Sequence, residues 1–289
     1  MNKDLPSPSK LPPLLFGFIS LSANFLSMLR SCFSRKETKW FEDNLERIWS
    51  LRPKSTFANM FIRQVYHSQI IIAFETLLEV LFPGCITFEG MEEFGAEISS
   101  LEKNKQGQIL VTAHLGSWEL VGYLSSRMAQ CKFYALAKPS KYKIATEILD
   151  RIRSKMKILV LWTSGVSAQK NMIKALKEGS WLGFVMDQKP MGRRGPKVEF
   201  WGQKTEFVGG PAQMAIKFKN PIIAVFCVRV GKLRYRIITK KILDIGQECS
   251  DIQVLTQIMA QEIEHVIKAY PEQWCWNYKR WRFDDKMTL

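Results

Sequence analysis

The chain contains 289 residues, of which 46% are hydrophobic and 12% aromatic, a composition that suits a folded core and excludes an intrinsically disordered chain. Its six cysteines form no C-x-x-C pair and no zinc or iron–sulfur spacing, so reduced thiols in a cytosolic compartment are expected. The formal net charge of +15 suits nucleic acid, an anionic membrane face or acidic substrates. Because no nucleic-acid-binding motif accompanies the charge, we expect an anionic membrane surface and no nucleic acid as the partner.

The first predicted element is an uncharged apolar segment over residues 11–29. Its length of about 19 residues is close to the minimum for crossing a bilayer, and basic residues follow it at Arg30, Arg35, Lys36 and Lys39. Such a helix can lie in the membrane interface or cross the membrane with its basic flank in the cytoplasm. A signal peptide and a buried core helix are the alternatives.

This segment and its basic flank predict two parts in the chain. We expect a membrane-associated segment over residues 1–38 and a single α/β domain over residues 39–289. The predicted location is the inner membrane, with the α/β domain on its cytoplasmic side.

Beyond residue 38, apolar periodicity predicts helices that alternate with short strands. Helices are predicted at residues 39–51, 57–82, 118–128, 144–155, 168–177, 212–219 and 252–269. Strands are predicted at residues 109–113, 132–137, 158–161, 181–186, 222–230 and 234–240. This alternation implies an α/β fold, with a largely parallel central sheet covered by helices on both faces, and with the last two strands as an antiparallel edge hairpin. Glu75 and Glu79 argue that the helix over residues 57–82 packs on the sheet and does not span a membrane.

A histidine lies at the carboxyl end of the predicted strand 109–113, where open α/β sheets gather their ligands. Ser117 is the expected N-cap of the following helix, and Glu119 lies in its first turn. The spacing predicts that Glu119 folds back to hold one nitrogen of His114, so that the other nitrogen can act as a general base. The alternative is an ordinary polar strand end followed by an ordinary acidic first turn.

A second polar group follows the predicted strand 181–186. Asp187 is expected to face the same cleft and to orient an arginine or a sugar hydroxyl, or else to be a plain turn residue. The basic residues that follow, Lys189, Arg193 and Arg194, are expected to meet phosphate groups.

Several segments resemble, in the right order, those of the late acyltransferases of lipid A biosynthesis. The matching segments are Asn44-Leu45, Thr112-Ala-His-Leu-Gly-Ser-Trp-Glu119, residues 168–179, Phe184-Val-Met-Asp-Gln188, Val198-Glu-Phe-Trp-Gly202, Gly209-Gly-Pro-Ala212 and Pro271-Glu-Gln-Trp-Cys-Trp276 with Lys279-Arg-Trp-Arg282. One departure is Lys138, which stands where the family usually carries an arginine. Lysine lacks the planar fork with which arginine grips phosphate.

The resemblance implies a glycerolipid-acyltransferase-like fold and an O-acyltransferase. Such an enzyme moves a fatty acyl chain from an acyl carrier protein or coenzyme A thioester to a glycolipid hydroxyl, here a lipid A precursor. His114 and Glu119 would be catalytic, and the resemblance adds Lys138, Arg153 and Gln188 to the substrate-binding residues. The thioester is a co-substrate, so no cofactor or metal is expected.

Other functions and other roles for the aromatic residues stay open at this point. The alternative enzymes are a phospholipid or phosphoinositol-mannoside-type acyltransferase and a thioester hydrolase. A binder of anionic membranes or of nucleic acid, without catalysis, is the alternative of another class. Trp274, Trp276 and Trp281 suit either a membrane-interface belt or packing near the C-terminus.

Overall fold

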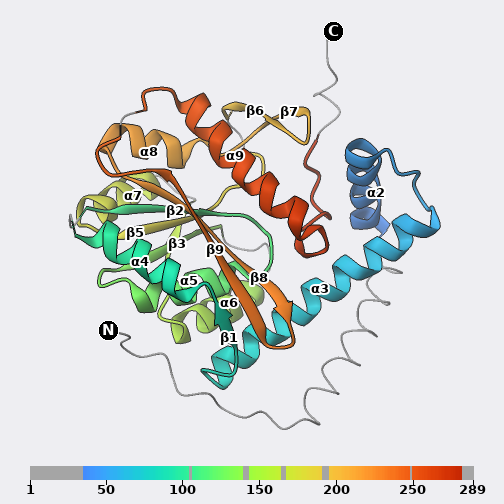
Figure 1. Ribbon diagram of the computed structural model, residues 1–289, viewed down its shortest axis with the longest axis horizontal. Coiled ribbons are helices and arrows are strands. Elements are labelled where there is room, and N and C mark those ends of the chain that lie inside the picture. Colours follow the sequence, from blue (N-terminus) through green and yellow to red (C-terminus); the bar gives the residue numbers. More distant parts are fainter. Residues whose placement is uncertain are drawn as a thin grey trace.

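The computed structural model describes residues 35–103, 106–138, 143–163, 167–190, 195–247 and 249–281, and its centre is a seven-stranded sheet (Figure 1). The strands of this sheet are β1 (Thr87–Glu89), β2 (Gln108–Thr112), β3 (Phe133–Ala137), β4 (Leu159–Trp162), β5 (Trp181–Val185), β8 (Ile222–Gly231) and β9 (Arg234–Leu243). They lie in the order β1-β9-β8-β2-β5-β3-β4, and every neighbouring pair is parallel except β8 and β9. The predicted α/β fold with a largely parallel sheet is therefore confirmed.

Helices cover both faces of the sheet, as the alternation of elements predicts. They are α2 (Arg35–Trp49), α3 (Thr56–Leu81), α4 (Met91–Glu102), α5 (Trp118–Met128), α6 (Lys143–Lys155), α7 (Ala168–Lys177), α8 (Gly210–Phe218) and α9 (Ile252–Ala269), with a short 3-10 helix at Pro271–Gln273. One apolar core joins α8 and α9 to one face of the sheet, and a second core joins α4 and α5 to the other (Figure 1).

One carboxylate of the long helix α3 fastens it to the sheet, and a second fastens it to helix α5. Glu75 is fully buried and accepts hydrogen bonds from Arg229 Nε and Tyr235 Oη, each at 2.8 Å. Glu79, 1% exposed, accepts one from Tyr123 Oη at 3.0 Å. A buried carboxylate is costly unless it is paired and hydrogen-bonded, and both conditions hold for Glu75. The prediction that this helix packs on the sheet is confirmed.

The sequence did not predict four elements: β1, α4 and the separate antiparallel hairpin of β6 (Lys197–Phe200) and β7 (Gln203–Glu206). The three strands among them have three or four residues, too few for alternation to stand out from chance. The β8–β9 hairpin is antiparallel as predicted, but its placement at the sheet edge is wrong because β1 pairs outside β9.

The predicted N-terminal membrane segment, residues 11–29, lies outside the described residues. Within the part of the chain that the structure does describe, no helix is both long enough and apolar enough to cross a bilayer. The division into residues 1–38 and 39–289 stays a prediction.

Candidate active site

Two strand ends meet at the centre of the sheet and bring His114 next to Asp187. Strands β2 and β5 are parallel neighbours, with Thr112 opposite Val185 in their register. His114 lies two residues beyond Thr112, and Asp187 lies two residues beyond Val185. Both residues therefore emerge at the same edge of the sheet. This is the carboxyl edge, where parallel α/β sheets place their ligands.

His114 and Asp187 form a hydrogen-bonded pair. His114 Nδ1 lies 2.7 Å from Asp187 Oδ1, and the backbone N–H of His114 donates to Oδ2 at 3.1 Å. Trp274 Nε1 donates to Oδ2 as well, at 2.8 Å. The carboxylate is 3% exposed and the imidazole 24% exposed. A carboxylate at Nδ1 favours the tautomer that carries its proton there, which leaves Nε2 as the acceptor nitrogen.

The charge state of Asp187 follows from its surroundings. Burial opposes ionisation, but the charges and hydrogen bonds around the carboxylate outweigh burial and lower the pKa of Asp187. The opposing contributions come from His114 first, then from the Trp274 hydrogen bond and the Arg280 charge. Asp187 is therefore an anion at neutral pH, as an orienting group for an imidazole must be.

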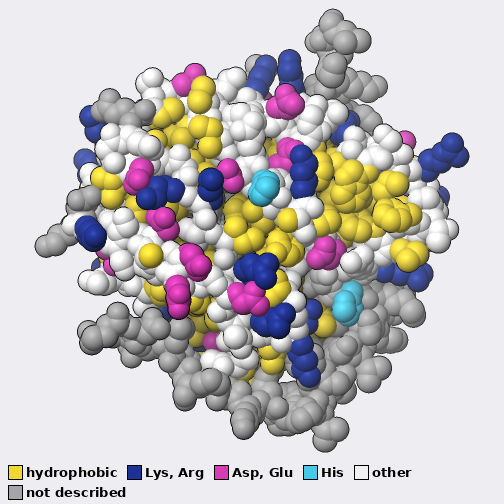
Figure 2. All heavy atoms as spheres, in the orientation of Figure 1, with side chains coloured by type: hydrophobic (Ala, Val, Ile, Leu, Met, Phe, Trp, Pro, Cys, Tyr) yellow, Lys and Arg dark blue, Asp and Glu magenta, His cyan; other side chains and the backbone are white. Residues whose placement is uncertain are grey.

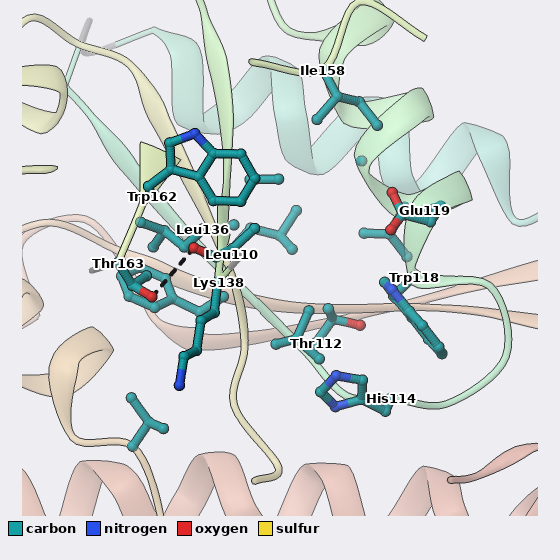
Figure 3. A pocket seen from close by; sticks show the side chains of 18 of the residues that line it. Leu110, Thr112, His114, Trp118, Glu119, Leu136, Lys138, Ile158, Trp162 and Thr163 are labelled. Carbon is teal, nitrogen blue, oxygen red and sulfur yellow. Dashed lines mark hydrogen bonds between the residues drawn. The ribbon is translucent and has the colours of Figure 1, made fainter. Parts of the chain in front are cut away.

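The predicted pairing of Glu119 with His114 is wrong. Arg153 of α6 holds Glu119 instead, with Nε donating to Oε2 at 3.0 Å and Nη2 donating to Oε1 at 2.6 Å. The Trp118 ring packs on the imidazole at 5.1 Å between centroids, and Glu119 lies beyond that ring (Figure 3). The first turn of α5 thus directs Glu119 toward α6 and away from the end of β2.

The two hydrogen bonds between Glu119 and Arg153 also affect the pKa of Arg153. Burial would lower the pKa of Arg153, but the hydrogen bonds and the charge of Glu119 raise it. Glu119 occupies Nε and Nη2, and Nη1 has no hydrogen-bond partner among the described residues. Arg153 therefore keeps donors with which it can meet a substrate.

A pocket of about 740 Å³ opens beside His114, Glu119 and Arg153 (Figure 3). Of the predicted site residues, those that line it are His114, Glu119, Lys138, Arg153, Gln188 and Lys189. Asp187 does not line the pocket but lies behind the imidazole, which corrects its predicted role as a substrate-binding residue. Arg193 and Arg194 lie outside the described residues. The interior of the pocket is apolar, with side chains such as Leu110, Phe133 and Met214.

The corner after β2 is fixed by neighbouring backbone. Ser117 caps α5 as predicted, since its Oγ accepts from Leu120 N at 3.3 Å. Gly116 has φ +58°, a conformation that favours glycine, and a Cβ there would overlap the Cys227 carbonyl. The Ser117 N–H, one candidate donor for an oxyanion, already donates to Cys227 O at 2.8 Å. Arg153, whose Nη1 is not taken by Glu119, is a donor that can serve an oxyanion instead.

The C-terminal segment supports the same corner, which no local pattern in the sequence predicts. Gly116 N donates to Gln273 O at 3.1 Å, and Cys275 N donates to His114 O at 3.0 Å. Trp274, Trp276 and Trp281 are 2%, 0% and 6% exposed, so their membrane-belt interpretation is wrong and their packing role is confirmed. The contact between Trp274 and Asp187 joins segments that are 87 residues apart, so it is visible only in the folded structure.

The described residues contain no cluster of histidine, cysteine and carboxylate groups suited to a metal ion. A buried aspartate that holds an imidazole at the mouth of a largely apolar pocket is an arrangement for general-base chemistry. Cations near that mouth suit a substrate that is apolar in one part and anionic in another. Fold and site together thus match α/β proteins whose pocket suits acid–base chemistry on a partly apolar molecule.

Comparison with known proteins gives the family. A profile of the bacterial lipid A biosynthesis acyltransferases matches residues 21–283, so the chain belongs to this family. It is also similar to the phosphatidylinositol mannoside acyltransferases of two strains of Mycobacterium tuberculosis, each 24% identical over 182 residues. That region is 62% of this chain and 55% of each relative, so the match spans about half the length of these curated relatives.

Proposed function

We propose that this chain is an O-acyltransferase that transfers a fatty acyl group from a thioester to a hydroxyl of a glycolipid. The observation that carries the proposal is the His114–Asp187 pair at the mouth of an apolar pocket. Family membership supports this choice among the reactions that such a base can serve. A lipid A precursor is the proposed acceptor, and an acyl carrier protein or coenzyme A thioester is the proposed donor.

In the proposed mechanism His114 serves first as base and then as acid. Nε2 accepts the proton of the acceptor hydroxyl while the hydroxyl oxygen attacks the thioester carbonyl carbon. Asp187 stabilises the imidazolium that forms, and Arg153 donates to the oxyanion of the tetrahedral intermediate. The carbon–sulfur bond then breaks, and the leaving thiolate takes the proton from His114. No acyl-enzyme forms and no cofactor enters.

The proposed roles of the remaining cations follow from their place at the pocket. Lys138 and Lys189 line it, and they would meet phosphate groups of the acceptor or of the donor's phosphopantetheine arm. Gln188 would donate to a sugar or amide oxygen. Arg193 and Arg194 are proposed to extend this phosphate-binding group.

An anionic membrane surface is the proposed site of work, at the cytoplasmic face of the inner membrane. Phe57 and Met60 near the start of α3 are 59% and 65% exposed, and the exposed Lys54 and Arg63 lie close to them in the chain. Apolar side chains gather over the region of α2 and α3, with lysine and arginine side chains around it (Figure 2). Apolar side chains with a basic margin suit the boundary between anionic headgroups and acyl chains.

A second acceptor class has support of its own. The curated relatives are named as phosphatidylinositol mannoside acyltransferases, so a mannosylated phosphoinositide is the alternative acceptor. It would use the same base and the same pocket. The two acceptors differ in the headgroup that the cations Lys138 and Lys189 would meet.

A panel of acceptors tests the proposal. The full chain would be incubated with radiolabelled acyl carrier protein or coenzyme A thioesters and with either a lipid A precursor or a phosphatidylinositol mannoside in mixed micelles. We expect label in the lipid A precursor. Label only in the mannoside would move the assignment to the alternative acceptor, and release of free fatty acid without lipid labelling would identify a thioester hydrolase. If no thioester is consumed in any of these reactions, the proposed function is overturned.

A double-mutant cycle tests the partner assigned to Glu119. We expect Glu119→Gln and Arg153→Gln each to lower kcat/KM by about 10²- to 10³-fold, because the first releases the guanidinium and the second removes it. The double variant should lose little more than either single variant, since paired residues are not additive. Losses that multiply would show that Glu119 acts independently of Arg153 and would overturn the role assigned to the pair.

A further inference from the structure

The inner half of the pocket is bounded by a row of three residues on the sheet, two of which are small. The register places Leu110 of β2, Gly183 of β5 and Ala135 of β3 side by side, and all three line the pocket. Helix α5 passes over this row and presents Gly122, which also lines the pocket. Two glycines and an alanine between a helix and a sheet leave room that ordinary side chains would fill.

The next row along the strands is built from large side chains. Two residues nearer to the strand starts, the register aligns Gln108, Trp181 and Phe133. Trp181 is fully buried, and Phe133 is 4% exposed. The pocket includes Phe133 but not Trp181, so the Phe133 ring is the side chain in this row that faces the open space.

The Phe133 ring leans into the space that the glycines leave. A Cβ added at Gly183 would lie 2.6 Å from Phe133 Cζ, and one added at Gly122 would lie 3.5 Å from Phe133 Cε1. Ile158 Cδ1 lies 3.0 Å from the same position on Gly122, so Ile158 closes the flank beside the ring. The ring is thus held between strand and helix, across the inner end of the pocket.

We propose that Phe133 is the floor of the acyl pocket and sets the length of the acyl chain that the enzyme accepts. This inference rests on the proposed acyl transfer. Four residues of strand separate His114 from Leu110, a rise of about 13 Å, which suits a fatty acyl chain and exceeds the need of a short acyl group. A chain with its carbonyl at His114 would pass Thr112, cross the row of three residues and end against the ring.

Two opposite changes test the floor. Phe133→Leu and Phe133→Ala vacate ring volume, so the preferred acyl chain should become longer. Gly183→Ala adds a methyl group that would lie 2.6 Å from Phe133 Cζ, so the ring must move off the sheet into the pocket and the preferred chain should become shorter. Each methylene that gains a buried place favours the longer substrate by about fourfold, so lengthening by two carbons should change the preference by about 15-fold.

The matched control is Phe226→Leu on β8. Phe226 is also fully buried in the sheet, but it does not line the pocket. This control should lose stability as Phe133→Leu does and keep the wild-type preference. The measurements are kcat/KM over a series of saturated acyl thioesters, and calorimetric binding of free fatty acids of the same lengths.

The two readouts separate the inference from the function on which it rests. A shifted fatty-acid preference in the Phe133 variants supports the floor whether or not the wild type transfers acyl groups. Active Phe133 variants with the wild-type length profile overturn the floor and leave the proposed function intact. If Phe133→Ala does not fold, an unchanged profile in Phe133→Leu and Gly183→Ala overturns the inference equally.

Discussion

Replacing His114 by alanine is expected to lower kcat for acyl transfer by about 10²- to 10⁴-fold, the range that a positioned general base contributes. The loss should fall on kcat, because the imidazole removes a proton in the transition state and holds little of the substrate. Fatty-acid binding in the pocket should stay within about twofold of the wild type, since the apolar interior supplies most of that binding. Steady-state kinetics with labelled thioester, together with calorimetry, measure both quantities.

His265→Ala is the matched control for this prediction. His265 lies on α9 with its side chain exposed, outside the pocket, so the variant should keep its full kcat. Equal rates for wild type and His114→Ala would remove the base from the mechanism. Equal loss in both histidine variants would point to a general defect of the preparations.

The corner that carries His114 could be predicted because its signals are local. A short apolar run ends in the histidine, Gly116 allows the turn, and Ser117 caps the next helix. Each signal lies within a few residues of the next, so tertiary contacts had little opportunity to override them. The same reasoning gave the long helix α3 to within one residue at each end.

The partner of His114 could not be predicted, because it depends on register between strands that are far apart in the chain. Asp187 lies 73 residues beyond the histidine and Trp274 lies 87 residues beyond Asp187. A spacing of five residues suggested Glu119, but the direction in which a first helical turn sends its side chain depends on what packs above it. Arg153 of α6 decides that direction, and its contact with Glu119 is also long-range.

Corrected in this way, the site exchanges the partners that the sequence predicted for its two carboxylates: Asp187 holds His114, and Glu119 holds Arg153. Asp187 is buried behind the imidazole and holds its Nδ1, whereas Glu119 holds the arginine that lines the pocket. Both carboxylates act through a partner and neither needs to touch the acyl group. Substitutions of the two carboxylates should therefore have different kinetic effects, and a substitution of Asp187 should have the clearer effect.

Replacing Asp187 by asparagine is expected to lower kcat by about 10²- to 10⁴-fold through the wrong tautomer of His114. Oδ2 of Asp187 accepts two N–H groups, from the His114 backbone and from Trp274, so the amide oxygen should take that place. The amide nitrogen then faces Nδ1 and donates to it. The imidazole proton must move to Nε2, which leaves no free nitrogen for the acceptor hydroxyl.

Trp274→Phe is the control variant. It disturbs the position of the Asp187 carboxylate without changing the tautomer of His114. It removes one hydrogen bond to Oδ2 and keeps an aromatic ring in the same place, so kcat should fall by about tenfold or less. A loss as large as that of Asp187→Asn would mean that the position of the carboxylate matters more than its charge. A nearly active Asp187→Asn protein would remove the orienting role altogether.

The pH dependence of stability gives an independent measurement of the Asp187 charge. Because the pKa of Asp187 is lower in the folded protein than in the unfolded chain, its ionisation contributes stability that is fully present above the unfolded pKa of about 3.9. That stability is lost as the pH falls through the folded pKa. The difference in Tm between wild type and Asp187→Asn should therefore narrow as the pH falls below about 4. A difference that does not change over this range would show that the aspartate is not held as an anion, and His114 would then lack the charge that steadies it as an imidazolium.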